Sequence, residues 1–233
     1  MRKVIATIKN ISEAYRLDSF EWDVPGDCPI EISSDILTGY KKNIFLKENL
    51  HLAIKADSTL ATHYWVIQKW GGIGSFKKNE RNDRKIVKFI DEIKDGKLTK
   101  STFECISSLS KVASFLDPDH YVIYDSRAIY TLNWLLFNLE NEAALFPQPN
   151  GRSSDLAKFD MQTIFRLSKK KISYRSYKNA YHDYCNIVKH LNEEVFGEGS
   201  KPYLLEMLLF MVAPRWTVGS IEKSVTVNIE NVA

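Results

Sequence analysis

Two residues of the 233-residue chain, Lys111 and Asp125, have side chains suited to specific chemistry at a short spacing. A lysine amine forms a Schiff base with the carbonyl carbon of a sugar once partial loss of hydration lowers its pKa. A carboxylate beside it stabilises a positively charged, oxocarbenium-like transition state or activates a nucleophile. The pair would therefore suit chemistry at a sugar carbon.

Each of the two residues also has a purely structural interpretation. Lys111 lies off the middle of the apolar stripe of its helix, and a lysine there is typically solvated at the surface. Asp125 follows an apolar run and precedes a helix, where an aspartate caps the first turn and interacts favourably with the helix dipole. Capping and chemistry are compatible for Asp125, because a carboxylate at a helix N-terminus stays ionised.

The segment over residues 102–136 has to place both side chains. One helix is predicted to begin at a cap at Thr99 or Ser101, with an apolar stripe at three- and four-residue spacing over residues 103–116. Residues 121–124 form a short apolar extended run, and a second helix is expected over residues 126–138. The sequence therefore predicts a helix, a break and a helix, with the lysine on the first helix and Asp125 at the start of the second.

An earlier helix is expected over residues 57–68. It stops at the stretch that contains Trp70, Gly71 and Gly72. Glycine allows a positive φ and a close approach to the backbone. One interpretation is a tight helix terminus with the tryptophan in the core. The other is that Trp70 forms the wall of a pocket, beside backbone that a bound strand can approach closely.

Residues 168–178 combine positive charge with tyrosines and serines. Lysine, arginine and hydroxyl groups bind a phosphate backbone, and tyrosines stack on unpaired bases. The alternative is a solvated loop and first helical turn. Arg127, two residues after Asp125, can pair with a carboxylate or a phosphate. The candidate binding residues in the basic run are Lys169, Lys170, Lys171, Tyr174 and Arg175.

Residues 110–113 (SKVA) and 123–127 (IYDSR) resemble the catalytic segment of the helix-hairpin-helix DNA glycosylases, especially the oxoguanine-glycosylase-like branch. The resemblance covers roughly residues 58–139, and the Trp-Gly-Gly stretch is similar to bacterial proteins of this branch. It implies an all-helical fold in which Lys111 attacks the sugar carbon of a flipped nucleotide and Asp125 assists. It implies neither a metal nor an organic cofactor.

The chain departs from this family at the hairpin, where the family normally has glycines whose amides hold a DNA phosphate. Residues 105–110, CISSLS, contain no glycine, so the hairpin is expected to be degenerate or absent, with serine hydroxyls or another contact in its place. The resemblance implies double-stranded DNA as the partner and a flipped, damaged or modified base as the substrate. Oxidised guanine and hypermodified bases of phage DNA both remain open. The residues expected to contact substrate or DNA are Ser110, Trp70, Gly71, Gly72, Arg127 and the basic run.

A function from another class fits the same residues: a non-catalytic helical module that binds nucleic acid or a protein. In that interpretation Asp125 is only a cap, Lys111 is only a surface charge, and the basic run carries the whole function. The two hypotheses differ in geometry. The enzyme requires Lys111 and Asp125 to converge on one concave site near Trp70.

The composition is that of a soluble globular protein, with 44% hydrophobic and 26% charged residues. A net charge of +3 does not by itself indicate a nucleic-acid partner. The three cysteines form no CxxC pair, which excludes a zinc ribbon or a four-cysteine iron–sulfur cluster built by this chain and fits a reduced cytoplasmic setting. The longest apolar run, over residues 203–213, is too short to span a bilayer. We expect a monomer without a metal site or a membrane segment.

The domain organisation expected is a single glycosylase-like domain over residues 1–233, with residues 1–57 and 152–233 as flanking lobes around residues 58–139. Three local expectations complete the picture: a short strand over residues 20–24, a helix beginning at residue 36, and a strand or a frayed end over residues 218–232.

Overall fold

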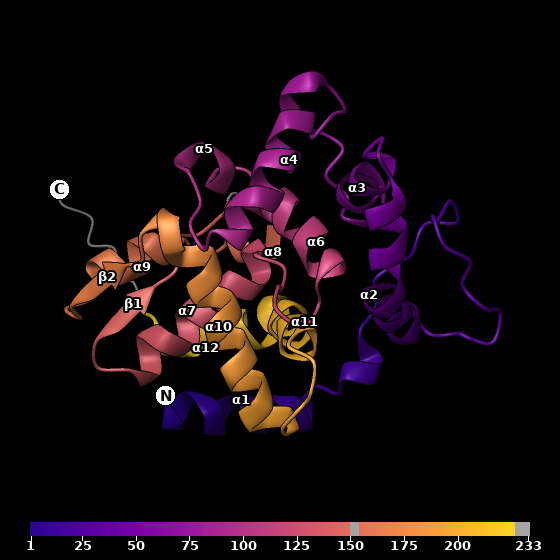
Figure 1. Ribbon diagram of the computed structural model, residues 1–233. Helices are drawn as coiled ribbons and strands as arrows, with labels where there is room; N and C mark the ends of the chain where they lie inside the picture. The colour runs from indigo at the N-terminus through magenta and orange to yellow at the C-terminus, as the bar shows by residue number, and fades with distance from the viewer. Residues whose placement is uncertain (150–153, 227–233) are drawn as a thin grey trace.

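Helices form nearly all of the regular structure in the computed structural model, which describes residues 1–149 and 154–226 (Figure 1). Helices contain 63% of the residues and strands 2%, which confirms the all-α class. The α-helices are α1 (Arg2–Ala14), α2 (Gly39–Ala56), α3 (Ala61–Tyr64), α4 (Glu80–Lys94), α5 (Lys100–Phe103), α6 (Ile106–Leu116), α7 (Ser126–Leu139), α8 (Ser154–Ala157), α9 (Met161–Leu167), α10 (Tyr177–Phe196), α11 (Tyr203–Val212) and α12 (Val218–Ser224). The other elements are a 3₁₀ turn, η1 (Leu17–Ser19), two π-helical turns, η2 (Trp65–Trp70) and η3 (Ala213–Thr217), and the strands β1 (Ala143–Leu145) and β2 (Ile172–Tyr174).

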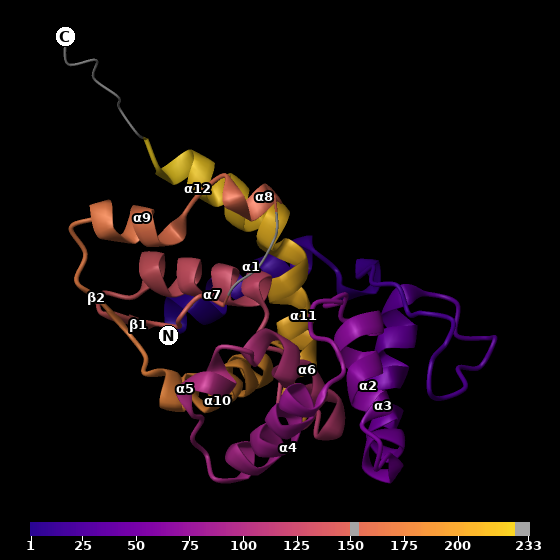
Figure 2. The same ribbon diagram turned by 90° about the horizontal axis from the view of Figure 1, so that it is seen from above.

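Helix α7 is central to one half of the molecule. Every residue from Ala128 to Phe137 is buried. A helix that is buried on all sides needs neighbours on all sides, and α11 packs along it most extensively, with α1, η3, β1 and α9 covering other faces. Figure 2 shows α7 between these neighbours.

Helix α6 is central to the other half. Helix α2 and η2 pack against it, and α4 and α5 also contact it. Figures 1 and 2 both place α2 and α3 on the side of the molecule opposite β1 and β2. One hydrophobic cluster joins the halves, because it contains buried side chains of α1, α2, α6, α7 and α12. Residues 1–57 and the described part of residues 152–233 thus share a core with residues 58–139.

The two strands pair in parallel, with Ala143 opposite Ile172 and Leu145 opposite Tyr174. Parallel strands require a crossover connection, and α8 and α9 lie within it. The backbone of Arg175 continues the pairing, since its N–H donates to the carbonyl of Leu145 at 2.8 Å. The pair therefore anchors the basic run beside the end of α7.

The single helix expected from a cap at Thr99 or Ser101 to residue 116 is in fact two helices. Helix α5 ends at Phe103, and α6 begins at Ile106. Between them the N–H of Cys105 donates to the carbonyl of Thr102 at 3.0 Å, which closes a tight turn. Two helices joined by a tight turn without glycine therefore replace the single helix, and Lys111 lies on the second of them.

Two local expectations near the N-terminus are wrong. Residues 20–24 form no strand, because side chains hold this segment instead: the indole of Trp22 donates to the carbonyl of Trp70 at 2.9 Å, and the amide of Asn43 donates to the carbonyl of Trp22 at 2.8 Å. Helix α2 begins at Gly39 rather than at residue 36. The hydroxyl of Thr38 caps it by accepting from the N–H of Lys41.

The C-terminal strand expected over residues 218–232 is wrong for residues 218–224, which form α12. Residues 227–232 lie outside the described part of the chain. The continuous helical stretch Tyr203–Ser224 is long and apolar enough to cross a membrane on length and composition alone, but 56% of its most apolar window is buried. It packs as a core helix, mainly against α7.

Candidate active site

Asp125 caps α7 as the sequence predicts. Its backbone is extended, with φ −93° and ψ 151°, and its Oδ1 accepts from the N–H of Arg127 at 2.8 Å. The side chain keeps 19% of its surface exposed, so solvent reaches the carboxylate. Its second oxygen, Oδ2, points towards Lys111 at 3.9 Å from Nζ.

Lys111 is buried, with only 5% of its surface exposed, so its interpretation as a solvated surface lysine is wrong. The reason is that α6 is covered by neighbouring elements on more than its apolar stripe. The amine donates to the carbonyl of Ser107, one turn earlier, at 2.9 Å. Burial lowers the pKa of Lys111, and the nearby carboxylates of Asp125 and Glu206 oppose that shift. The amine of Lys111 is thus easier to deprotonate than that of an ordinary solvated lysine.

Gly71 follows η2 and lies directly against the lysine. A Cβ built on Gly71 would be 2.6 Å from Lys111 Cδ. The neighbouring Gly72 has a φ of +68°, a left-handed conformation that favours glycine, and it faces open space. The two glycines therefore do different things: one makes room for the lysine, and the other turns the chain after η2.

Trp70 is in the core, as one of the two interpretations expected. Its indole donates to Oδ1 of Asn43 at 2.8 Å, and its ring meets Phe115 edge-on at a centroid distance of 4.7 Å. Only 7% of its surface is exposed. Trp70 therefore packs against Phe115 of α6 and presents no free stacking face.

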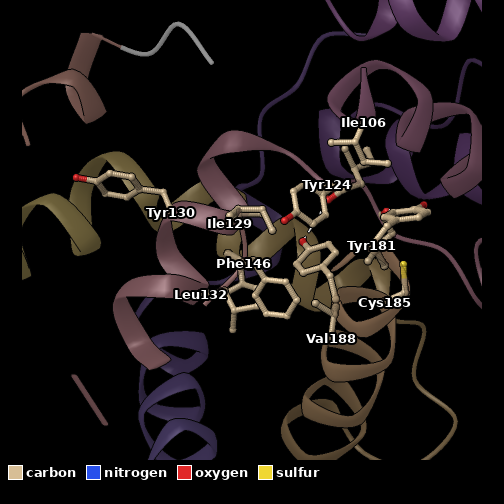
Figure 3. Close-up of a cluster of buried hydrophobic side chains, with 14 of the residues drawn as sticks. Ile106, Tyr124, Ile129, Tyr130, Leu132, Phe146, Tyr181, Cys185 and Val188 are labelled. Atoms are coloured by element: carbon tan, nitrogen blue, oxygen red, sulfur yellow. Dashed lines mark hydrogen bonds between the residues drawn. The ribbon is translucent and has the colours of Figure 1, made fainter. Parts of the chain in front are cut away.

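Ser110 has a structural role in place of the DNA contact expected. It is fully buried, and its hydroxyl accepts from the backbone N–H of Tyr124 at 3.0 Å. The ring of Tyr124 meets Tyr184 of α10 edge-on. It also meets Phe146, the residue after β1, edge-on (Figure 3). This hydrogen bond ties α6 to the residue before Asp125 and so sets the position of the carboxylate relative to the lysine.

Arg127 lies in the first turn of α7, two residues after Asp125, and is half-buried. Its guanidinium carbon is 4.8 Å from the centroid of the Phe210 ring, a cation–π contact. Phe210 also meets Trp22 edge-on at 5.5 Å. An aromatic group and a cation are thus already stacked close to the start of α7.

The basic run is divided by the structure. The amine of Lys170 donates to the carbonyls of Phe137 and Asn138, which end α7, and Arg175 pairs with Asp183 at 2.8 Å. These two residues have structural partners. The run's other candidate residues, Lys169, Lys171 and Tyr174, are exposed on and beside β2.

Three further residues meet at this site that the sequence analysis did not select: Lys47, Ser114 and Glu206. Lys47 and Glu206 are 2% and 3% exposed, and their side chains approach to 3.9 Å. The only signal in the sequence was that Glu206 interrupts an otherwise apolar run, since a charge inside a core helix needs a partner. No such signal marks Lys47.

Two cavities bear on the site, one between α2 and α4 and one next to Asp125. One cavity, of about 990 Å³, is bounded by α2, α4 and the loop after α6, with His51, Leu116 and Tyr203 among its lining residues. A smaller one of about 240 Å³ is lined by Ser126, the residue after Asp125, by Gln148, and by residues of α8 and α9. Neither cavity is lined by Lys111 or Asp125. The described residues contain no group of three or more histidine, cysteine or acidic side chains placed to hold a metal ion.

Comparisons of the chain with family models, with curated protein sequences and with solved structures find no match.

Proposed function

We propose that the protein is a DNA glycosylase that flips out a damaged or modified base and cleaves its N-glycosidic bond. The observation that carries the proposal is the convergence of Lys111 and Asp125. A buried amine and a partly exposed carboxylate lie 3.9 Å apart, on two helices joined by a short extended segment. A desolvated amine beside a carboxylate is the arrangement required for nucleophilic attack with charge stabilisation.

The chemistry can be written with these two side chains. The uncharged Nζ of Lys111 attacks C1′ of the flipped nucleotide. The bond from C1′ to the base nitrogen breaks, and the base departs with that electron pair and takes up a proton. Asp125 stabilises the positive charge that develops on the sugar. The lysine nitrogen then loses a proton, and the C1′–O4′ bond breaks as O4′ takes up a proton, which opens the sugar ring to a Schiff base. Water hydrolyses the Schiff base, which frees Lys111 and leaves an abasic site.

Two substrate classes follow from the resemblance: oxidised guanine and the hypermodified bases of phage DNA. The experiment is a screen for abasic sites after incubation with duplexes that carry candidate bases and with modified phage genomic DNA. On the substrate found, Asp125→Asn is expected to release base at least about 10²-fold more slowly, because the carboxylate charge is lost. Asparagine caps helices as well as aspartate does, so the variant should unfold at nearly the parent temperature. Equal activity of Asp125→Asn and the parent would remove Asp125 from the mechanism.

Lys111 is tested by trapping. Borohydride reduces a Schiff base to a stable covalent adduct, so the parent protein should cross-link to its substrate DNA and Lys111→Met should not. Base release without any adduct in the parent would mean that water, not Lys111, attacks the sugar. Methionine keeps most of the packing volume of the lysine stem.

The exposed Lys169, Lys171 and Tyr174 also suit a nucleic-acid-binding module without catalysis. The same screen separates the two functions. A binding module retains duplexes but produces no abasic sites, and Asp125→Asn leaves its affinity unchanged.

A further inference from the structure

Lys47 and Glu206 form a buried ion pair directly behind the candidate site. Lys47 is on α2 and Glu206 is on α11, and less than a twentieth of either residue is exposed. Their Nζ and Oε2 atoms are 3.9 Å apart, and Oε2 has no hydrogen-bond partner among the described residues. Burying two charges is costly unless they meet partners, so the residues that surround the pair indicate its role.

A chain of hydrogen bonds connects Lys47 to Lys111. The amine of Lys47 donates to the hydroxyl of Ser114 at 2.9 Å, and that hydroxyl donates to the backbone carbonyl of Lys111 at 2.9 Å. Lys47 also lies over the rings of Phe115 and Trp70, at 4.5 and 5.9 Å from their centroids. The ammonium group thus has a fixed place between α2 and the turn of α6 that carries Lys111.

The two pairs also share one electrostatic environment. Burial is the main cause that lowers the pKa of Lys47, and the charge of Lys111 lowers it further. Burial likewise raises the pKa of Glu206, with Lys47 opposing that shift and Asp125 adding to it. Four ionisable groups of alternating sign therefore interact across α2, α6, α7 and α11.

Two further titratable groups near this cluster come from α10. Tyr184 and Cys185 both sense the charge of Glu206. Burial holds the pKa of Tyr184 well above its ordinary value and raises that of Cys185 to about 12. Both therefore stay uncharged near neutral pH, and Lys47 and Glu206 are the groups that balance the charge around Lys111 and Asp125.

We propose that Lys47 and Glu206 act as a positioning pair for Lys111, fixing its helical turn through Ser114 and setting the charge that its amine faces. This inference rests on the glycosylase proposal, in which the uncharged amine is the nucleophile. The cation of Lys47 disfavours a second ammonium group at Lys111, whereas the anion of Glu206 favours it. While the pair is intact the two charges oppose each other, and burial remains the main cause that lowers the pKa of Lys111.

The two charges can be removed separately with side chains of similar size. Glu206→Gln leaves the Lys47 cation unbalanced, so the pKa of Lys111 should fall. Lys47→Met leaves the Glu206 anion unbalanced, so the pKa of Lys111 should rise. A shift of about one pH unit in each direction is the order expected for a close charge in a protein interior. A purely structural pair would instead weaken both variants in the same way.

The probe is a duplex with a single abasic site, whose aldehyde forms a Schiff base with a lysine amine whatever base was removed. The measurement is the rate of borohydride trapping against pH, and the midpoint of the profile should move down for Glu206→Gln and up for Lys47→Met. In the double variant Lys47→Met/Glu206→Gln both charges are absent, so the two shifts should offset each other and the midpoint should lie between those of the single variants. Lys55→Met, an exposed lysine on the same helix, is the matched control and should leave the midpoint unchanged.

Ser114→Ala separates positioning from charge. It removes the hydrogen-bond link and no charge, so the trapping rate should fall several-fold with the midpoint unchanged. If one single-charge variant does not fold, this variant and the double variant still decide the inference. Midpoints that move in the same direction in the single variants, a midpoint that moves by a full unit in the double variant, or an unchanged rate in Ser114→Ala would each overturn it.

A DNA-free readout keeps this test apart from the glycosylase proposal. The Cε resonance of Lys111, assigned by its loss in Lys111→Met, reports the pKa of the amine by NMR titration. Opposite shifts of that pKa without base release from any DNA would overturn the proposed function and leave the charge-setting role standing. Base release together with an unchanged pKa of Lys111 in both charge variants would overturn the charge-setting role and leave the proposed function standing.

Discussion

Gly71 and Lys111 are in such close contact that no side chain fits between them. A Cβ on Gly71 would lie 2.6 Å from Lys111 Cδ, 2.8 Å from its Cε and 2.8 Å from the carbonyl oxygen of Ile67. The φ of Gly71 is −82°, which any residue adopts. Space, and not backbone conformation, therefore requires glycine here. The end of η2 is the surface against which the lysine stem is fixed.

Gly71→Ala tests this contact. The lysine stem can move, but the carbonyl of Ile67 belongs to the backbone and cannot rotate away, so we expect a loss of about 1–3 kcal/mol from overpacking. Displacement of Lys111 should also slow base release. Gly74→Ala is the matched control, because a Cβ there meets nothing within 4 Å. Thermal unfolding of both variants measures the difference, and equal midpoints would contradict the contact.

Ser110→Ala tests the link between α6 and the residue before Asp125. Removing the hydroxyl leaves the buried N–H of Tyr124 without its acceptor, which costs about 1–3 kcal/mol. Ser107→Ala, on the same helix, is the control, because the buried Ser107 hydroxyl has no partner among the described residues. Urea unfolding should show a clear loss for Ser110→Ala and none for Ser107→Ala. A comparable loss in both would assign the effect to helix packing.

Asp57 should make stability depend on pH in the acid range. Burial raises the pKa of this carboxyl, but hydrogen bonds from Thr59 and Thr62 outweigh burial and hold the pKa well below 3.8. A depressed pKa stabilises the fold above pH 3.8, and that contribution is lost as the pH falls through the folded-state value. Asp57→Asn should therefore flatten the fall in stability below about pH 4. Chemical unfolding at a series of pH values measures it, with the exposed Asp23→Asn as the control.

The basic run should separate into DNA-binding and structural lysines. Lys169→Gln and Lys171→Gln should each weaken binding to a duplex and reduce the slope of log affinity against log salt by about 1. Lys170→Gln should mainly lower the unfolding temperature, because Lys170 caps the last carbonyls of α7. Fluorescence anisotropy at several salt concentrations, together with thermal unfolding, gives both quantities. Identical salt slopes for Lys169→Gln and the parent would place the DNA elsewhere.

Local chemistry explains why much of the helical layout could be predicted. Asp125 caps α7 through Arg127, and Asp160 caps α9, because both capping bonds form within three residues along the chain. The stripe of Ile86, Phe89 and Ile93 is buried in α4 as its spacing requires. Such contacts depend only on neighbours in sequence, so they are visible without a fold.

The burial of Lys111 could not be predicted in the same way. Its environment is made by Gly71, Asp125 and, through Ser114, by Lys47 and Glu206, which come from separate elements. Whether a lysine is solvated depends on which elements cover its helix. Spacing along one helix carries no information about that. The sequence by itself determined most of the helices, the cap of α7, and the choice of a lysine and an aspartate as candidates. Only the tertiary structure decided that the lysine is buried, that the two side chains meet, and that a second ion pair lies behind them, because burial and charge balance are properties of packed neighbours.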